Sequence, residues 1–109
     1  MGTFKEVYER ETGRECITTF WDDFTIAEIW GFAGIKNTFD RAFKEWKHDI
    51  KYLSELAIVL NWKSWKWAEK DEKIAQLYID CGDIVADYVY SDDTPTTPED
   101  RQYFLEVTD

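Results

Sequence analysis

The sequence is short of the residues that build metal sites, disulfide frameworks and tight turns. Its 109 residues include one histidine, two cysteines, two prolines and five glycines. A single histidine excludes a multi-histidine metal site, and two distant cysteines exclude a disulfide framework or a zinc ribbon. Scarce glycine and proline disfavour an all-β domain, which needs many tight turns.

Long apolar runs are lacking too. No apolar stretch reaches the length needed to span a bilayer, and no signal peptide is recognisable at the N-terminus. Cysteine usage indicates a reducing compartment. We therefore expect a cytoplasmic protein that makes no membrane contact.

Aromatic residues and carboxylates are abundant. Aromatic residues make up 17% of the chain and hydrophobic residues 44%, which is enough to build a core. The length is that of one ordinary domain. We predict a single helical domain over residues 1–109.

The negative charge is concentrated at one end. The formal net charge is −10, and residues 71–109 hold eleven acidic and two basic side chains, a net of −9. This acidic C-terminal third repels nucleic acid and attracts a basic protein surface. We expect no direct nucleic-acid binding, because no basic stripe is present to contact phosphates.

Hydrophobic spacing predicts an all-α fold of about five helices around a central helical hairpin. The hairpin is formed by residues 49–69 and 72–90. Shorter helices are expected within 3–13, 18–30 and 35–47, with a last one after Thr97 and a corner marked by Gly31 and Gly34. The apolar stripe predicted for the second hairpin helix comprises Ile74, Leu77, Tyr78, Cys81, Ile84, Val85 and Tyr88.

The residue types present exclude most kinds of catalytic site. Glu45 and His48 match half of a di-iron motif, but the second histidine is missing, so we expect His48 to be an exposed residue at a helix end. Cys81 is expected to be buried and structural, whereas the role of Cys16 stays open. No glycine-rich loop is present to hold phosphates. We expect no enzyme, no cofactor and no metal, with a small carboxylate-based metal enzyme as the open alternative.

Three aspartates define a candidate binding face. Asp80, Asp83 and Asp87 recur at spacings of three and four on one side of the predicted helix, and Asp92 and Asp93 extend them. The alternatives are a solvated helix side and a hard-cation site, although EF-hand spacing is absent. As a recognition surface, the aspartates would engage Lys and Arg of a partner.

Six tryptophans are more than so small a domain easily buries. Trp62 and Trp65 are the candidates for exposure, because Trp62 lies off the main apolar face and Trp65 stands between lysines. An exposed tryptophan beside charge is a common interface hot spot. Nearby Lys63, Lys66 and Lys70 would otherwise form a solvated basic side.

Three stretches carry a resemblance to a known group of proteins. Residues 19–27, 38–47 and 60–63 read TFWDDFTIA, TFDRAFKEWK and LNWK. They resemble small hypothetical proteins carried by integrative elements and phages of gut-type bacteria, over most of residues 18–70. The resemblance implies mobile-element cargo and assigns no catalytic residue. Small acidic proteins of such elements include inhibitors of host defence, some of which mimic nucleic-acid charge.

The sequence therefore favours a non-catalytic protein-binding module. The most specific version of this hypothesis is an anti-defence inhibitor, of the anti-CRISPR or anti-restriction type, with an acidic, nucleic-acid-mimicking face. Its partner would be another protein with a basic surface. The alternative is a structural or assembly protein that homo-oligomerises through exposed aromatics.

Overall fold

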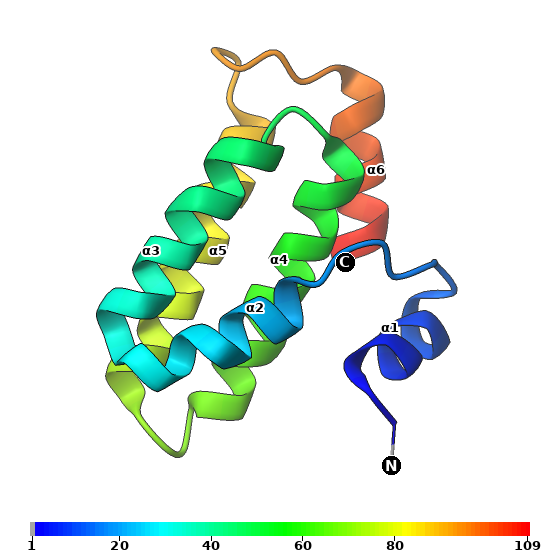
Figure 1. The fold of residues 1–109 in the computed structure, drawn as a ribbon. Helices are drawn as coiled ribbons and strands as arrows, with labels where there is room; N and C mark the ends of the chain where they lie inside the picture. The colour runs from blue at the N-terminus through cyan, green and yellow to red at the C-terminus, as the bar shows by residue number, and fades with distance from the viewer. Residues whose placement is uncertain (1) are drawn as a thin grey trace.

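A computed structural model describes residues 2–109, which form six α-helices and one short 3₁₀ helix (Figure 1). The α-helices are α1 (Phe4–Thr12), α2 (Phe20–Ala27), α3 (Gly31–Trp46), α4 (Ile50–Trp67), α5 (Glu72–Tyr90) and α6 (Pro98–Thr108). The 3₁₀ helix η1 (Glu28–Trp30) joins α2 to α3. The all-α prediction is confirmed, and none of the described residues lies in a strand.

Antiparallel α4 and α5 form the central hairpin, and they share the most extensive helix interface. Asp49 begins α4 and Asp71 begins α5, because each carboxylate accepts hydrogen bonds from two backbone N–H groups of the first turn. α3 packs beside this hairpin mainly through α5, and α6 covers α4 on the other side. Thr97 caps α6 in a capping box with Asp100, as the sequence predicts for Thr97 and Pro98.

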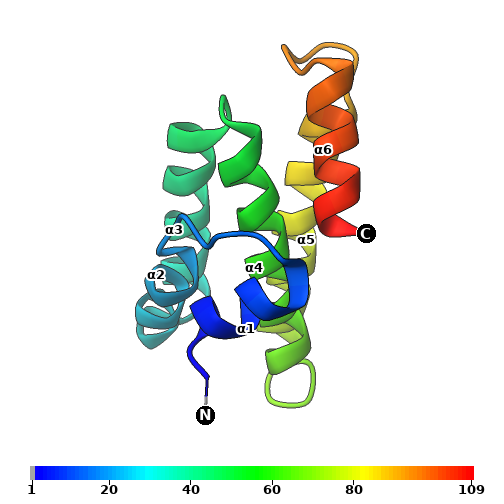
Figure 2. The same ribbon diagram turned by 90° about the vertical axis from the view of Figure 1, so that its right-hand side faces the viewer.

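The N-terminal helices cross the hairpin instead of running along it (Figure 2). α2 crosses α4, where Phe20, Phe24 and Ala27 enter the main core. α1 lies against the side of α4, and Tyr8 joins Ile58 and Val107 in a second, smaller core. α4 is thus buried on more than one side, as its scattered apolar residues predict.

The structure corrects two details of the predicted elements. Ile84, placed on the apolar stripe of α5, is exposed, because the stripe that faces the core is narrower and centres on Cys81 and Val85. Gly31 does mark the corner, with φ of 70°, whereas Gly34 lies inside α3. A Cβ at Gly34 would lie 2.5 Å from the Trp30 Cβ and 2.6 Å from the Ala27 carbonyl oxygen. Gly34 therefore allows the end of α2 and η1 to approach α3 closely.

Candidate protein-binding surface

The predicted acidic residues are all on the surface. Asp80, Asp83 and Asp87 lie on the exposed side of α5 and are called the acidic face below. Within residues 2–109 none of the three forms a salt bridge, although the Gln76 side-chain amide donates a hydrogen bond of 2.8 Å to Asp80. Asp92 and Asp93 follow in the exposed loop before α6. Among residues 2–109, no group of three or more His, Cys, Asp or Glu side chains could hold a metal ion.

The two predicted tryptophans differ in exposure. Trp65 is 66% exposed, as expected. Trp62 is half-buried instead, because α1 folds back over α4. Its ring packs edge-on against Phe4, with 5.4 Å between ring centroids, and lies near Tyr8. The expectation of an exposed Trp62 is therefore wrong, and the contact that buries it is not visible in a helical wheel of α4.

Four further exposed apolar residues lie close together in the sequence, where α2 turns through η1 into α3. Ile26, Ile29, Trp30 and Phe32 are 61%, 79%, 76% and 52% exposed, and together they are called the apolar corner below. Sequence reasoning missed these four residues as a surface. A signal was present, because this stretch holds more large apolar residues than the buried face of one short helix can take.

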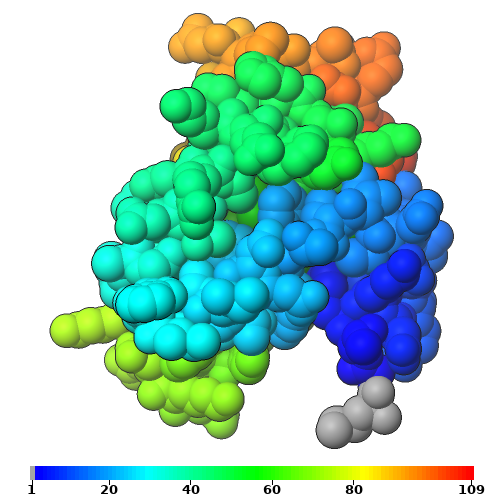
Figure 3. All heavy atoms as spheres, viewed as in Figure 1, coloured from blue at the N-terminus to red at the C-terminus, as the bar shows by residue number. Residues whose placement is uncertain are grey.

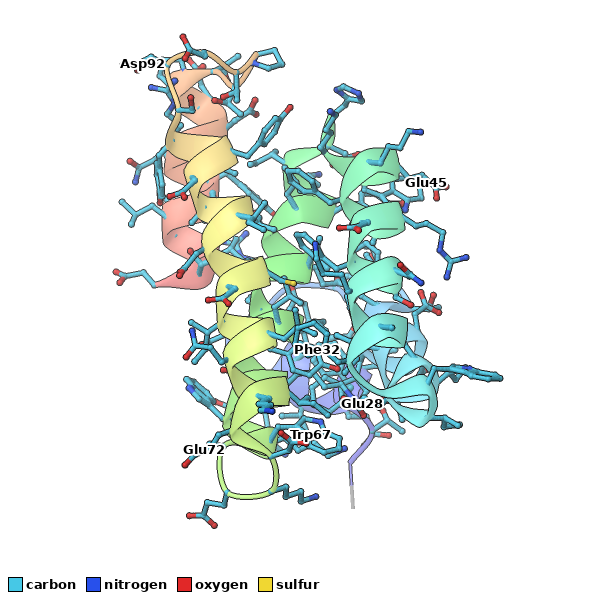
Figure 4. All side chains as sticks on the ribbon, turned by 90° about the vertical axis from the view of Figure 1, so that its left-hand side faces the viewer. Glu28, Phe32, Glu45, Trp67, Glu72 and Asp92 are labelled. Atoms are coloured by element: carbon cyan, nitrogen blue, oxygen red, sulfur yellow. The ribbon has the colours of Figure 1, made fainter. Side chains whose placement is uncertain are left out.

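A buried polar network holds the apolar corner in place. Glu28 lies between the corner residues in sequence, and its Oε2 accepts hydrogen bonds from Trp67 Nε1 at 2.8 Å and from the Tyr78 hydroxyl at 2.6 Å. Lys63 Nζ lies 3.2 Å from the same oxygen. These four residues are called the Glu28 anchor; Figure 4 shows Glu28 and Trp67 near one another below the core. The anchor joins η1 to both helices of the hairpin.

Lys63 contradicts the expectation of a solvated basic side. Its side chain is fully buried, donates a hydrogen bond of 2.7 Å to the Thr25 hydroxyl, and lies 4.2 Å from the centroid of the Trp21 ring. Burial lowers the pKa of Lys63, and the neighbouring Glu28 carboxylate opposes that change. A buried ion pair contributes little net stability compared with apolar packing, but it requires one defined arrangement of its partners. The anchor therefore ties η1, which lies within the exposed corner, to both helices of the hairpin.

A groove opens beside the apolar corner, between α2 and α3, on the face shown in Figure 3. Its volume is about 780 Å³. Trp30 and Ile26 line the groove near the corner, and Trp46 lines it near the end of α3. Polar side chains contributed by both helices alternate with this apolar surface, namely Asp23, Asn37, Thr38, Arg41 and Glu45.

A second buried carboxylate holds the segment between α1 and α2. Glu55 of α4 accepts backbone hydrogen bonds of 2.9 Å from Ile17 and Thr18, and it also accepts from the Thr18 hydroxyl. The Cys16 thiol lies 3.6 Å from the same carboxylate. Burial is the main cause that raises the pKa of Glu55. We call this arrangement the Glu55 strap, and sequence reasoning missed it because Glu55 stands within a helix assigned to the core.

Cys16, Cys81 and His48 are the residues considered above for catalysis. Burial and the Glu55 carboxylate raise the pKa of Cys16 to about 11, and burial raises that of Cys81 to about 12. A thiol of this kind is protonated at neutral pH and is a poor nucleophile. Cys81 is buried, as expected, and His48 is exposed just beyond α3. These two predicted placements are confirmed.

Within residues 2–109 no helix is both long enough and apolar enough to cross a membrane. No protein-family model, curated protein or solved structure matches this chain.

Proposed function

We propose that this chain is a non-catalytic protein-binding module whose contact surface is the apolar corner. The observation that carries the proposal is the gathering of four large apolar side chains, each at least half exposed, within seven residues. Single exposed apolar residues such as Trp65 are ordinary on protein surfaces, whereas several exposed apolar residues at one turn of the chain indicate a candidate interaction site.

Rigid support strengthens the proposal. Binding by a mobile segment requires that the segment be ordered on association, which weakens affinity. The Glu28 anchor fixes η1 to α4 and α5 before any partner arrives. Trp30 is thus presented as a large side chain of the type that dominates interface energetics. When a partner buries Trp30, this chain therefore loses little conformational entropy.

Net charge supports a partner with a basic surface. The chain carries a formal charge of −10, and such a field accelerates encounter with a positively charged protein and repels acidic ones. Apolar contacts at the corner supply affinity, while the charge selects which proteins approach. Binding is therefore expected to slow, but not to disappear, as salt is added.

The proposal is tested by photo-cross-linking in bacterial cells. A photoreactive phenylalanine analogue replaces Trp30 in one variant and the comparably exposed Trp65 in another. We expect one specific cross-linked protein from position 30, lost when Ile29→Ser is added, and none from position 65. Equal yields of the same product from both positions would contradict the assignment of the corner.

The acidic face supports a second candidate function, an anti-defence inhibitor that presents carboxylates to the nucleic-acid groove of a nuclease. Asp80, Asp83 and Asp87 are exposed together on α5 and have no salt-bridge partner within residues 2–109. Changing all three to Asn should abolish capture of such a nuclease without unfolding the chain. Unchanged capture would exclude the mimic.

A further inference from the structure

We infer that the groove between α2 and α3 receives an amphipathic α-helix of the protein partner, flanked by Lys and Arg. This inference rests on the proposed function and names the shape and charge of the surface that meets the apolar corner. Three observations carry it, namely the spacing of the lining residues, the length of the groove and its charge.

The groove is lined like a helix-packing surface. On α3 the lining residues fall into adjacent pairs four positions apart, which are 33 and 34, 37 and 38, 41 and 42, and 45 and 46. Rows at this spacing form the ridges and grooves into which a neighbouring helix packs. The core-facing side of the same helix, with Ile35 and Phe39, is already occupied. α3 thus presents a second packing side, which α2 and η1 cover in part at Gly34 and which is open along the groove.

Side-chain size and length also suit a helix. Small residues, Ala33 and Ala42, line the groove between Trp30 and Trp46, so another helix can approach α3 closely there. From Ala33 to Trp46 the lining extends over thirteen residue steps, or about 20 Å at 1.5 Å per residue. A partner helix of roughly four turns would fill it, with apolar residues spaced three or four apart.

The charged residues that line the groove favour a partner helix with positive charge. Asp23 and Glu45 line the groove together with Arg41, which leaves an excess of one carboxylate. The neighbouring Lys36 is already paired with Asp40, at 3.4 Å. A second copy of this chain is disfavoured as the occupant, because two molecules of charge −10 repel one another. Lys or Arg beside the apolar stripe of a partner helix would meet Asp23 and Glu45.

The probe is a synthetic helical peptide of about four turns, with leucines at helical spacing and lysines on both flanks. Its binding is measured by isothermal titration calorimetry against two variants with matched chemistry. Asn37→Trp places a large side chain of α3 in the groove. Gln102→Trp also replaces an amide side chain with Trp, but at an exposed position of α6 outside the groove. Circular dichroism verifies that both variants keep the fold.

We expect Asn37→Trp to weaken peptide binding at least about tenfold and Gln102→Trp to change it less than about twofold. A peptide with glutamates in place of the lysines should bind at least about tenfold more weakly. Equal weakening by both variants, or no detectable binding of the lysine peptide, would overturn the inference. So would a larger loss on changing Asp80, Asp83 and Asp87 to Asn, which would place the peptide on the acidic face.

Two further outcomes separate this inference from the proposed function. If cross-linking from position 30 persists while the peptide fails to bind, the groove inference falls and the corner remains a binding surface. If both fail, both are wrong. A mass that rises with concentration in analytical ultracentrifugation, and no longer does so in Asn37→Trp, would assign the groove to a second copy instead.

Discussion

The apolar corner and the acidic face are both exposed, but they are supported in opposite ways. The acidic face stands on an ordinary helix whose other side, with Cys81 and Val85, packs into the core. The corner stands on a buried network that joins three elements through Glu28, Lys63, Trp67 and Tyr78. Exposed carboxylates are the usual state of a helix surface, whereas clustered exposed apolar residues are not.

This difference shows which surface needs an explanation beyond folding. Water solvates Asp80, Asp83 and Asp87, so their exposure requires no partner. Each exposed apolar residue of the corner forgoes part of the roughly 1.5–3 kcal/mol that full burial of such a side chain contributes. The chain also places a lysine and a glutamate in its interior to fix this corner, where apolar residues would pack as well or better. Support of that kind is expected where geometry matters more than stability.

Breaking the Glu28 anchor should give the largest effect. Lys63→Met leaves the Glu28 carboxylate buried without its cation, so we expect a loss of about 3–5 kcal/mol in the free energy of unfolding. Glu28→Gln combined with Lys63→Met removes both charges and should recover a large part of that loss. Urea unfolding followed by tryptophan fluorescence measures both variants. A loss below about 1 kcal/mol in Lys63→Met would show that the anchor does not hold the corner.

The Glu55 strap offers a comparison with a carboxylate that has no cation. Glu55→Gln cannot accept every hydrogen bond from Ile17 and Thr18, so we expect a loss of about 1–3 kcal/mol. Burial raises the pKa of Glu55 in the folded chain, so its protonation favours folding. The stabilisation from protonated Glu55 is fully present below the pKa of Glu55 in the unfolded chain. It is lost as pH rises through the pKa of Glu55 in the folded chain. The difference between wild type and Glu55→Gln should therefore grow as pH falls from 7 to 5.

Urea unfolding at several pH values tests this sign. Comparing the two proteins at each pH cancels the relief of general charge repulsion, which affects both. A difference that shrinks toward pH 5 would contradict the raised pKa of Glu55.

Both supports lie beyond what sequence patterns reveal, and the reason is physical. Periodicity and caps predict the hairpin, the ends of α5 and the Thr97 cap, because these depend on residues close in sequence. The Glu28 anchor joins residues 35 to 50 positions apart, and the Glu55 strap joins residues 37 to 39 positions apart. Helical wheels place Lys63 beside Lys66 and Lys70 but do not show Trp21 and Glu28 covering it.

The candidate site was only partly predictable for the same reason. Asp80, Asp83 and Asp87 are exposed because charged residues on a helix surface generally are. The exposure of Trp65 agrees with its position between lysines in the sequence. Trp62 is covered by α1, whose position depends on the second core. Trp30 is exposed because Gly31 turns the chain after η1, and that turn determines on which side the apolar residues emerge.

Two glycines should respond in opposite ways to an added methyl group. A Cβ at Gly34 would collide with Trp30 and the Ala27 carbonyl, so Gly34→Ala should lower the free energy of unfolding by about 1–2 kcal/mol. At Gly82 in α5 an added methyl group would have no atom within 4 Å, so Gly82→Ala should raise it by about 0.5–1 kcal/mol. Thermal unfolding of the two variants checks the opposite signs. Stabilisation by Gly34→Ala would mean that the corner tolerates movement of Trp30.

Neutralising the acidic face should have a small effect, opposite in sign to the loss expected for Lys63→Met. Asp80, Asp83 and Asp87 repel one another at spacings of three and four, and Asp87 lies near the negative C-terminal end of α5. Changing all three to Asn should raise the free energy of unfolding by about 0.5–1 kcal/mol at low salt, with the gain fading at high salt.

Asp22→Asn is the matched control, because this aspartate lies in the first turn of α2, where the helix dipole favours a carboxylate. It should lower the free energy of unfolding slightly, by a few tenths of a kcal/mol. Chemical denaturation at two salt concentrations measures both variants. A gain from the triple change would mean that the chain keeps these carboxylates at a cost in stability, which favours a binding role for the acidic face. A loss would show that they stabilise α5 and need no partner.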